Sequence, residues 1–430
     1  MRIYASNVIL LGMLTTLRNS RFRRLLLSHV LALLGTGLAT IALGFVAFDL
    51  AGDQSGSVLG TVLAIKMLCF MVVAPLAAAV LVRFQPRTVM VGSDVLRAAV
   101  AVCLPFVSDV WHIYALIVVL YIASAVFTPT FQATIPRVLP DDRDYGNALA
   151  LSRLAYDVEA LMSPVLTGIL LLVIPTQYLF FGTALGFAAS ALLIGSLVLP
   201  KALPSESRDA PFMKRLTLGS RLLFATPALR GIFTLQLALA GSGSFVMVQT
   251  VAIVRGPLGA DAAAVALALG AMGAGSICGA LSSPGLVARL GTRRVLLFAG
   301  VLVSLPPFGV PLALSLNGTP GLAILAALWF VLGIGYSGVL TPVGQVIRAT
   351  VPEPELPAVF AAQFSLAHGW WLLCYPLAGW LGALTSLGTA AVVLAGISFT
   401  AALAASFIWR DMTRRHVVGD DDRMTEDARP

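Results

Sequence analysis

Charged residues are scarce in this sequence, and their scarcity decides the class of protein. Of 430 residues, 11% are Asp, Glu, Lys or Arg and 58% are hydrophobic, whereas a soluble globular protein carries about 25% charged residues. The hydrophobic residues form long blocks, and a bilayer core of about 30 Å needs about 20 apolar residues in each helix. Barrel strands of about 10 residues, alternating polar with apolar, do not occur. The composition therefore excludes a soluble domain and indicates an all-α membrane protein.

Cysteine and catalytic motifs are also sparse. Each of the four cysteines lies inside an apolar block, and none forms a CxxC pair, which argues against a disulfide framework or a metal site. The sequence has no phosphate-binding glycine loop, no HExxH and no nucleophile elbow. We therefore expect no enzyme activity, no cofactor and no ATP-driven transport.

We also expect no secretory signal, because a basic cluster follows the first apolar run (8–17) where a cleavage site would stand.

Twelve apolar blocks predict twelve transmembrane helices, with one long polar break after the sixth. The break divides the chain into an N-terminal segment (1–24), a six-helix bundle (25–199), a linker (200–230), a second six-helix bundle (231–409) and a tail (410–430). The linker mixes basic with large apolar residues over 211–229, which predicts an amphipathic helix at the membrane surface; the charged tail predicts disorder. The predicted spans are 25–48, 57–81, 88–108, 111–130, 148–174, 177–199, 231–254, 262–287, 294–315, 320–341, 358–383 and 388–409.

Positive charge gathers on one side of the predicted bundle. With the N-terminus inside, 24 of the 28 Lys and Arg residues fall in the N-terminal segment, the inner loops, the linker and the tail. Arg255 alone lies in an outer loop, and the remaining three lie within spans. This asymmetry is the positive-inside rule, so we expect both termini in the cytoplasm and the protein in the cell membrane. Because the basic residues are scattered among loops, the net charge of +8 does not indicate nucleic-acid binding.

The two halves of the chain repeat one another. Arg24, Gly35 and Gly37 recur 206 residues later as Arg230, Gly241 and Gly243, and Thr128, Pro129 and Gln132 recur 213 residues later as Thr341, Pro342 and Gln345. Six spans is an even number, so the halves should be parallel repeats about an axis along the membrane normal. Such repeats place a substrate site between the halves near mid-membrane and permit alternating access.

Several stretches resemble a known family of membrane proteins. They are APLAAAVLVRFQPRTVMVGSDVLRA (74–98), FTPTFQATIPRVLP (127–140), GNAL (146–149) and SPVLTG (163–168). With them the chain resembles the major facilitator superfamily over nearly its whole length, and within it the bacterial exporters related to the enterobactin exporter and macrolide-efflux proteins. The resemblance implies a twelve-helix secondary transporter that exports small molecules in exchange for protons. We expect it to work as a monomer in the lipid bilayer.

The resemblance also assigns candidate gating and bending residues. The first stretch resembles the superfamily's GxLaDRxGRR loop: Arg83 and Arg87 are kept, while Val82 takes the acidic position. Asp94 and Arg97 are candidates to replace the lost gating ion pair. In the equivalent loop of the second half the candidates are Arg289 and Arg293. SPVLTG resembles a degenerate GPxxGG element of antiporters, which would bend the fifth helix. A simple proline kink is the alternative, and the residues concerned are Ser163, Pro164 and Gly168.

Ionisable residues within the spans are the strongest candidates for function, because charge in hydrocarbon is costly. Arg153 and Asp157 are four residues apart and can pair on one helix face, whereas Glu159 points to a different face. A carboxyl in a low-dielectric cavity can take up and release a proton near neutral pH, which predicts that Asp157 or Glu159 carries the coupling proton. Lys66 is a further candidate. A purely structural network is the alternative interpretation of all four.

The second half offers mainly uncharged polar candidates. His368 lies mid-span and matches Tyr156 at an offset of 212, next to Asp157. It can titrate during transport or bind substrate, and a histidine packed against a carbonyl group is the alternative. Gln363 and Gln236 are candidates to donate hydrogen bonds to a substrate.

Two transport functions remain open from the sequence. The first is proton-coupled export of a small amphipathic organic compound such as a drug, siderophore or metabolite. The second is export of a divalent metal cation such as nickel, with Asp157, Glu159 and His368 as ligands, which must converge within about 2.0–2.6 Å of one ion. The tail holds only His416 where metal exporters of this kind are often histidine-rich, so the first function is favoured. In either case the partners are a small solute, protons and lipid.

Overall fold

The computed structural model describes residues 15–80, 84–139, 141–171, 173–199, 212–316, 318–352 and 355–426. Each of the twelve predicted spans contains an α-helix in this part of the chain, and none of the described residues forms a strand. Contacts between residues divide the chain into two units. The first comprises Met1–Ser205 with Ala260–Gly270, and the second comprises Glu206–Gly259 with Ala271–Pro430. Nine segments of the described chain are long and apolar enough to span a membrane by themselves, and one of them (Ser20–Val73) contains two helices.

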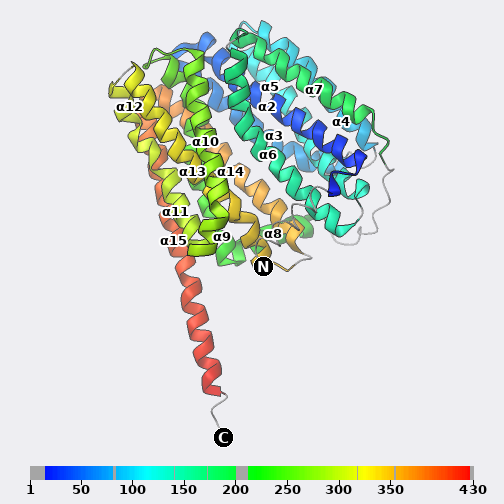
Figure 1. The fold of residues 1–430 in the computed structure, drawn as a ribbon, viewed down its shortest axis with the longest axis vertical. Coiled ribbons are helices and arrows are strands. Elements are labelled where there is room, and N and C mark those ends of the chain that lie inside the picture. The colour runs from blue at the N-terminus through cyan, green and yellow to red at the C-terminus, as the bar shows by residue number, and fades with distance from the viewer. Residues whose placement is uncertain are drawn as a thin grey trace. The chain divides into compact units, whose positions relative to one another are not determined.

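The first unit consists of six long helices, coloured blue to green in Figure 1. Side-chain caps start two of them: Asn19 accepts hydrogen bonds from the backbone of Arg21 and Phe22 before the first helix, and Asp109 accepts one from Trp111 before the fourth. These bonds satisfy amide groups that a helix start leaves free. The helices are α2 (Ser20–Ala51), α3 (Ser55–Val80), α4 (Pro86–Cys103), α5 (Val110–Val138), α6 (Asp142–Leu171) and α7 (Leu179–Gly195).

The second unit repeats this arrangement after one short helix. Its helices are α8 (Phe212–Ala225), α9 (Pro227–Arg255), α10 (Ala262–Leu290, whose first residues are counted with the first unit), α11 (Thr292–Ser304), α12 (Val310–Leu316), α13 (Gly318–Thr350), α14 (Leu356–Leu384) and α15 (Leu387–Glu426). The same pairs pack in both units: α2 on α7 as α9 on α15, and α4 on α5 as α11 on α13.

Glycine contacts show how closely the two units correspond. A methyl group at Gly35 of α2 would lie 3.1 Å from the carbonyl oxygen of Thr183 in α7. One at Gly241 of α9 would lie 3.2 Å from the carbonyl oxygen of Leu394 in α15. Small residues of this kind let helices approach closely in lipid. The internal repeat predicted from the sequence is therefore present in the packing.

Two sequence predictions are wrong in detail. The ninth span, predicted as one helix over 294–315, is broken into α11 and α12 by a 3₁₀ turn at Pro306–Gly309. Pro306 and Pro307 lack the amide hydrogens that a continuous helix needs. The tail, predicted to be disordered, continues α15 as a helix to Glu426, and this red helix extends past its neighbours in Figure 1. Oppositely charged residues four apart, such as Asp411 and Arg415, favour helix there.

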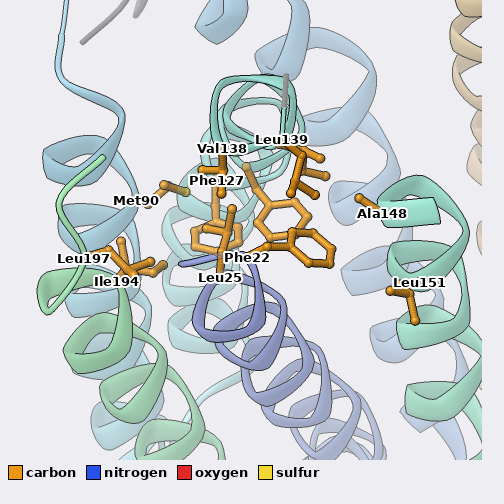
Figure 2. Packing of buried hydrophobic residues seen from close by; sticks show 12 residues of the cluster. Phe22, Leu25, Met90, Phe127, Val138, Leu139, Ala148, Leu151, Ile194 and Leu197 are labelled. Carbon is orange, nitrogen blue, oxygen red and sulfur yellow. The ribbon is translucent and has the colours of Figure 1, made fainter. Parts of the chain in front are cut away.

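A hydrophobic core cluster of the first unit lies where five of its helices meet. Phe22 and Leu25 of α2 pack against Phe127 and Phe131 of α5, and Met90 of α4 joins them. Figure 2 shows the side chains of Phe22, Leu25 and Phe127 close together. Side chains from α6 and α7 complete the cluster. Because hydrophobic burial alone does little to hold helices together in lipid, such close packing supplies much of the cohesion of the bundle.

Candidate functional site

A carboxylate in α6 lies against a glycine of α2. A methyl group at Gly37 would lie 2.5 Å from Oε1 of Glu159 and 2.6 Å from Cβ of Ser163. Glu159 and Ser163 are four residues apart and so share one face of α6. Gly37 therefore allows α2 and α6 to approach until the polar face of α6 touches the α2 backbone. Glu159 is one of the coupling candidates identified in the sequence, and Ser163 is one of the predicted bend residues.

Two further helices bring Lys66 and Tyr121 close to this contact between α2 and α6. Nζ of Lys66 in α3 lies 5.6 Å from the ring centroid of Tyr121 in α5, and the side chain of Thr40 in α2 contacts the Tyr121 hydroxyl. Lys66 and Glu159 interact electrostatically. Lys66 and Glu159 do not form an ion pair in the described structure, so they attract one another without direct contact. Four helices of the first unit thus place a cation, a carboxylate and a phenol close together.

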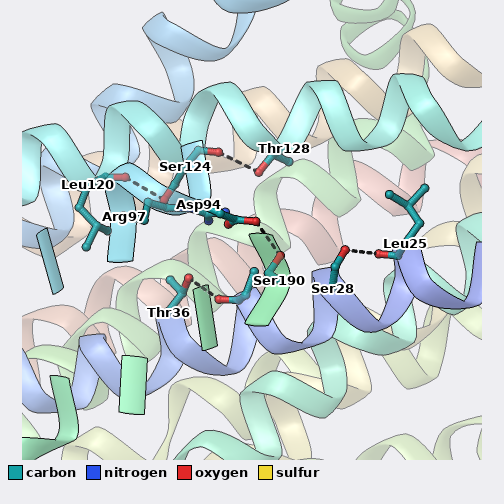
Figure 3. A network of polar contacts seen from close by, with 10 residues as sticks. Leu25, Ser28, Thr36, Asp94, Arg97, Leu120, Ser124, Thr128 and Ser190 are labelled. Carbon is teal, nitrogen blue, oxygen red and sulfur yellow. Dashed lines mark hydrogen bonds and ion pairs between the residues drawn. The ribbon is translucent and has the colours of Figure 1, made fainter. Parts of the chain in front are cut away.

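The described ion pair joins Asp94 and Arg97, three residues apart in α4. Arg97 donates to one carboxylate oxygen of Asp94, and Ser190 of α7 donates to the other at 2.7 Å. Figure 3 shows Ser190 reaching across to α4. The guanidinium lies between two phenyl rings, 4.5 Å from the centroid of Phe127 and 4.4 Å from that of Phe187. Both charged residues are buried, with exposures of 0% and 3%, and they fasten α4 to α5 and α7. Whether the pair also gates transport stays a prediction.

The sequence assigned no role to His29 of α2. In the structure its side chain is surrounded by aromatic rings from other helices. Its ring stacks on Phe131 at 4.1 Å between centroids and meets Tyr156 of α6 edge-on at 5.3 Å. The side chain is 2% exposed, and neither ring nitrogen has a hydrogen-bond partner among the described residues. A lone histidine in an otherwise apolar block was the available signal. Its partners come from helices about 100 residues farther along, which sequence spacing does not reveal.

In the second unit, aromatic residues occupy the position that corresponds to Glu159. A methyl group at Gly243 of α9 would lie 2.7 Å from Cη2 of Trp371 in α14. Trp371 stands 212 residues after Glu159, and Gly243 stands 206 after Gly37. The rings of Tyr336 and Tyr375 lie 6.5 Å and 5.2 Å from the Trp371 ring. The equivalent contact between helices is therefore made by an indole.

The polar candidates of the second unit differ in their surroundings. Nδ1 of His368 lies 2.7 Å from the Phe364 carbonyl oxygen, as in the packed-histidine alternative. Gln236 is buried in α9. Nε2 of Gln363 is buried in α14 and has no hydrogen-bond partner among the described residues. Gln363 is thus a candidate that keeps a free donor.

The candidate gating arginines differ from one another. Arg87, at the start of α4, donates a hydrogen bond to the carbonyl oxygen of Gly195, the last residue of α7. This contact places a cation at the negative end of a helix. Arg289 is exposed and Arg293 is half-buried. Arg83 lies outside the described residues.

Some candidates fall where the structure describes no side chain. Arg153, Asp157 and Pro164 belong to α6, but only their backbone is described, so their pairing and the bend stay predictions. Gly168 is half-buried on α6. No group of three or more His, Cys, Asp or Glu residues suited to a metal ion occurs in the part of the chain that the structure describes.

Comparison with known proteins gives consistent matches along the chain. The profile of the Major Facilitator Superfamily matches residues 25–322. The MFS-type transporter YfiS of Bacillus subtilis (strain 168), itself uncharacterized, is 26% identical over 356 residues, covering 79% of this chain and 81% of YfiS.

Solved structures of transporters share the fold at low sequence identity. The nucleoside transporter NupG matches with a TM-score of 0.66 and 16% identity over 90% of this chain and 98% of NupG. A bacterial homologue of the human lysosomal transporter Spinster, inward-facing and occupied, matches with a TM-score of 0.69 and 13% identity over 91% and 97% of the two chains. A POT family transporter in complex with 5-aminolevulinic acid matches with a TM-score of 0.68 and 12% identity, also over 91% and 97%.

Proposed function

Because the chain belongs to the Major Facilitator Superfamily, we propose that it is a secondary transporter that exports a small amphipathic organic compound in exchange for protons. Its all-α fold is that of the superfamily, which spans the membrane many times. Alternating access between two similar units is the mechanism that such repeats support. The resemblance to exporters of the enterobactin and macrolide type supports the outward direction.

The observation that carries the proposal is the position of Glu159. Its carboxylate lies at a contact between two helices, against Gly37, with Lys66 close enough to attract it. A proton on Glu159 removes one charge of this pair and leaves Lys66 without its counter-charge. Loss of the proton restores the attraction between α6 and α3. Protonation therefore changes the forces among three helices of one unit, which is how a proton can drive a conformational cycle.

Residues of the second unit support an organic substrate. Trp371, Tyr336 and Tyr375 form an aromatic cluster on α13 and α14, and Gln363 on α14 keeps a buried amide without a partner among the described residues. Aromatic faces and a few polar groups are typical of sites for small organic ligands. Transporters of similar fold bind small organic molecules, including a nucleoside transporter and a complex with 5-aminolevulinic acid. The divalent-metal alternative has no comparable support among the described residues.

Transport in proteoliposomes separates coupling from binding. A strain expressing the protein is first screened for resistance against a panel of amphipathic organic compounds and divalent metals, which identifies a transported probe. Purified protein is then tested for uphill transport driven by a pH gradient, and for exchange of labelled against unlabelled probe without a gradient. We expect Glu159→Gln to abolish uphill transport and to retain exchange, because a permanently neutral side chain mimics the protonated state.

The matched control is Glu355→Gln. Glu355 precedes α14 and makes no side-chain capping hydrogen bond, so this variant should keep both activities. If Glu159→Gln still concentrates the probe against a gradient, Glu159 does not carry the coupling proton. Resistance to metals alone would reject the organic substrate.

A further inference from the structure

The short helix α8 has two different faces. Positions 212, 216, 219 and 223 are spaced so that they lie on one face of the helix. On this face Gly219 and Leu223 are buried where α8 packs against α9 and α14. The opposite face, positions 214, 218, 221 and 225, has the same spacing, and Leu218, Arg221 and Ala225 on it are exposed. The helix is therefore fixed to the protein by one side and open on the other.

The charge of this segment has one sign. Residues 212–230 contain four basic residues and no acidic residue. Arg221 and Arg230 are exposed, as are the apolar side chains of Leu218 (38%) and Phe224 (48%). Basic residues beside exposed leucine and phenylalanine are typical of a helix that lies at the surface of an anionic bilayer.

The position of α8 along the chain sets it at the membrane surface. It ends at Ala225, and α9, a membrane span, begins two residues later at Pro227. The ring of Phe224 meets that of Phe233 edge-on at 5.5 Å, so the end of α8 is packed against the second turn of α9. The C-terminal end of α8 therefore lies beside the start of a membrane span, near the level of the lipid headgroups.

Aromatic contacts connect α8 to the interior of the second unit. The Phe233 ring lies 5.1 Å from the ring of Trp370 in α14, and Nε1 of Trp370 donates a hydrogen bond to the Phe233 carbonyl oxygen at 3.1 Å. Trp370 adjoins Trp371, the residue equivalent to Glu159. Phe224, Phe233 and Trp370 thus form a continuous series from the surface helix through α9 to α14.

We propose that the outer face of α8 binds the phosphate headgroups of anionic phospholipids, and that the bound lipid stabilises α14 through Phe224, Phe233 and Trp370. Arg221 meets the phosphates, and position 214, seven residues earlier and so on the same face of the helix, carries a second basic residue. Leu218 and Phe224 enter the upper acyl region. The bilayer is then a ligand of the transporter as well as its solvent. The inference does not depend on which solute is carried.

Lipid titration of the full-length protein in neutral detergent tests the proposal. Intact-protein mass spectrometry counts bound phosphatidylglycerol and, separately, phosphatidylcholine. We expect preferential retention of phosphatidylglycerol, and about 30-fold weaker binding for the double variant Lys214→Gln/Arg221→Gln, since each basic residue near an anionic surface contributes about 5-fold. Binding should also weaken at about 1 M salt, where the Debye length is about 3 Å.

The matched control removes two exposed arginines from other ends of helices, Arg294→Gln/Arg348→Gln, and should retain phosphatidylglycerol. Arg221→Lys keeps the charge and should bind as the parent does, which guards against a loss caused by misfolding. Equal binding of both lipids, equal loss in the control, or displacement of the lipid by excess inorganic phosphate would each reject a lipid surface at α8.

The connection to α14 has its own measurement. Phosphatidylglycerol should raise the melting temperature of the parent protein. Phe224→Leu should bind the lipid but show a smaller rise, because the first ring of the series is lost. An unchanged rise in this variant would refute the aromatic connection.

Discussion

At equivalent positions of the two units, a glycine of the first long helix faces a carboxylate in one and an indole in the other. Gly37 meets Glu159 in the first unit, and Gly243 meets Trp371 in the second. The same contrast holds for the spans as a whole. The first six contain Lys66, Asp94, Arg97, Arg153, Asp157 and Glu159, whereas the last six contain no charged residue apart from Arg294, which stands at the boundary of its span and is counted with the inner loop.

From this contrast we propose that one fold, used twice, divides the chemistry of transport. Charge in a span is costly and is kept where it functions, so we expect protons to act through the first unit. Aromatic surface suits an amphipathic solute, so we expect the second unit to supply most of the binding surface. Fold similarity with other transporters does not by itself give this division, because function belongs to sites placed on a fold.

The largest expected effect concerns the buried ion pair, whose equivalent positions in the second unit are uncharged. The positions 206 residues after Asp94 and Arg97 are Gly300 and Val303. Asp94→Ala leaves the Arg97 cation buried without its partner and should cost about 3–5 kcal/mol of unfolding free energy. Unfolding of the purified protein by denaturant in mixed micelles measures it. The double variant Asp94→Leu/Arg97→Leu should recover much of the loss. Equal instability in both variants would show that the charge is not the cause.

The paired glycines give the next effect. Gly37→Ala places a methyl group 2.6 Å from Cβ of Ser163, an atom attached to the helix backbone, and should cost about 1–3 kcal/mol. Gly243→Ala meets the far end of the Trp371 ring, which can turn aside, and should cost less. Side-by-side unfolding measurements compare the two variants. A greater loss for Gly243→Ala would contradict the view that the first unit is packed more rigidly at this contact.

A smaller effect separates binding from coupling. Trp371→Leu removes an aromatic face and should raise the KM for the transported probe about 10-fold while leaving the maximal rate and proton coupling unchanged. Glu159→Gln should show the opposite pattern. Initial rates over a range of probe concentrations, with and without a pH gradient, measure both. If Trp371→Leu lowers only the stability of the protein, the indole is a packing residue.

The smallest effect tests the link between α4 and α7. Ser190→Ala removes one hydrogen bond to Asp94 and should cost about 1 kcal/mol. A buried serine of α15, Ser398, has no hydrogen-bond partner among the described residues. Ser398→Ala should therefore be nearly neutral in the same unfolding measurement. Similar losses in the two variants would remove the asymmetry between the units.

The sequence predicted the helices well because span length is a direct property of composition. It missed the break at Pro306, since hydropathy does not register a missing amide hydrogen. Residues close in sequence could be paired in advance, as Asp94 and Arg97 show. Ser190 could not be paired, because it lies 96 residues from Asp94. The repeat offsets matched Gly37 to Gly243 and Tyr156 to His368, and the offset of 212 already matches Glu159 to Trp371. Only the structure shows that Gly37 faces Glu159 in the first unit and that Gly243 faces Trp371 in the second.

The Arg97 guanidinium, held between two phenyl rings and bonded to Asp94, has a consequence for electrical behaviour. The pair is neutral as a whole and moves as one body with α4, so a voltage across the membrane does no net work on it. One uncompensated charge that crosses the membrane exchanges about 2.3 kcal/mol for each 100 mV. A proton that Glu159 carries, as we propose, would be such a charge. Any dependence of the transport rate on voltage should therefore disappear together with the Glu159 carboxyl.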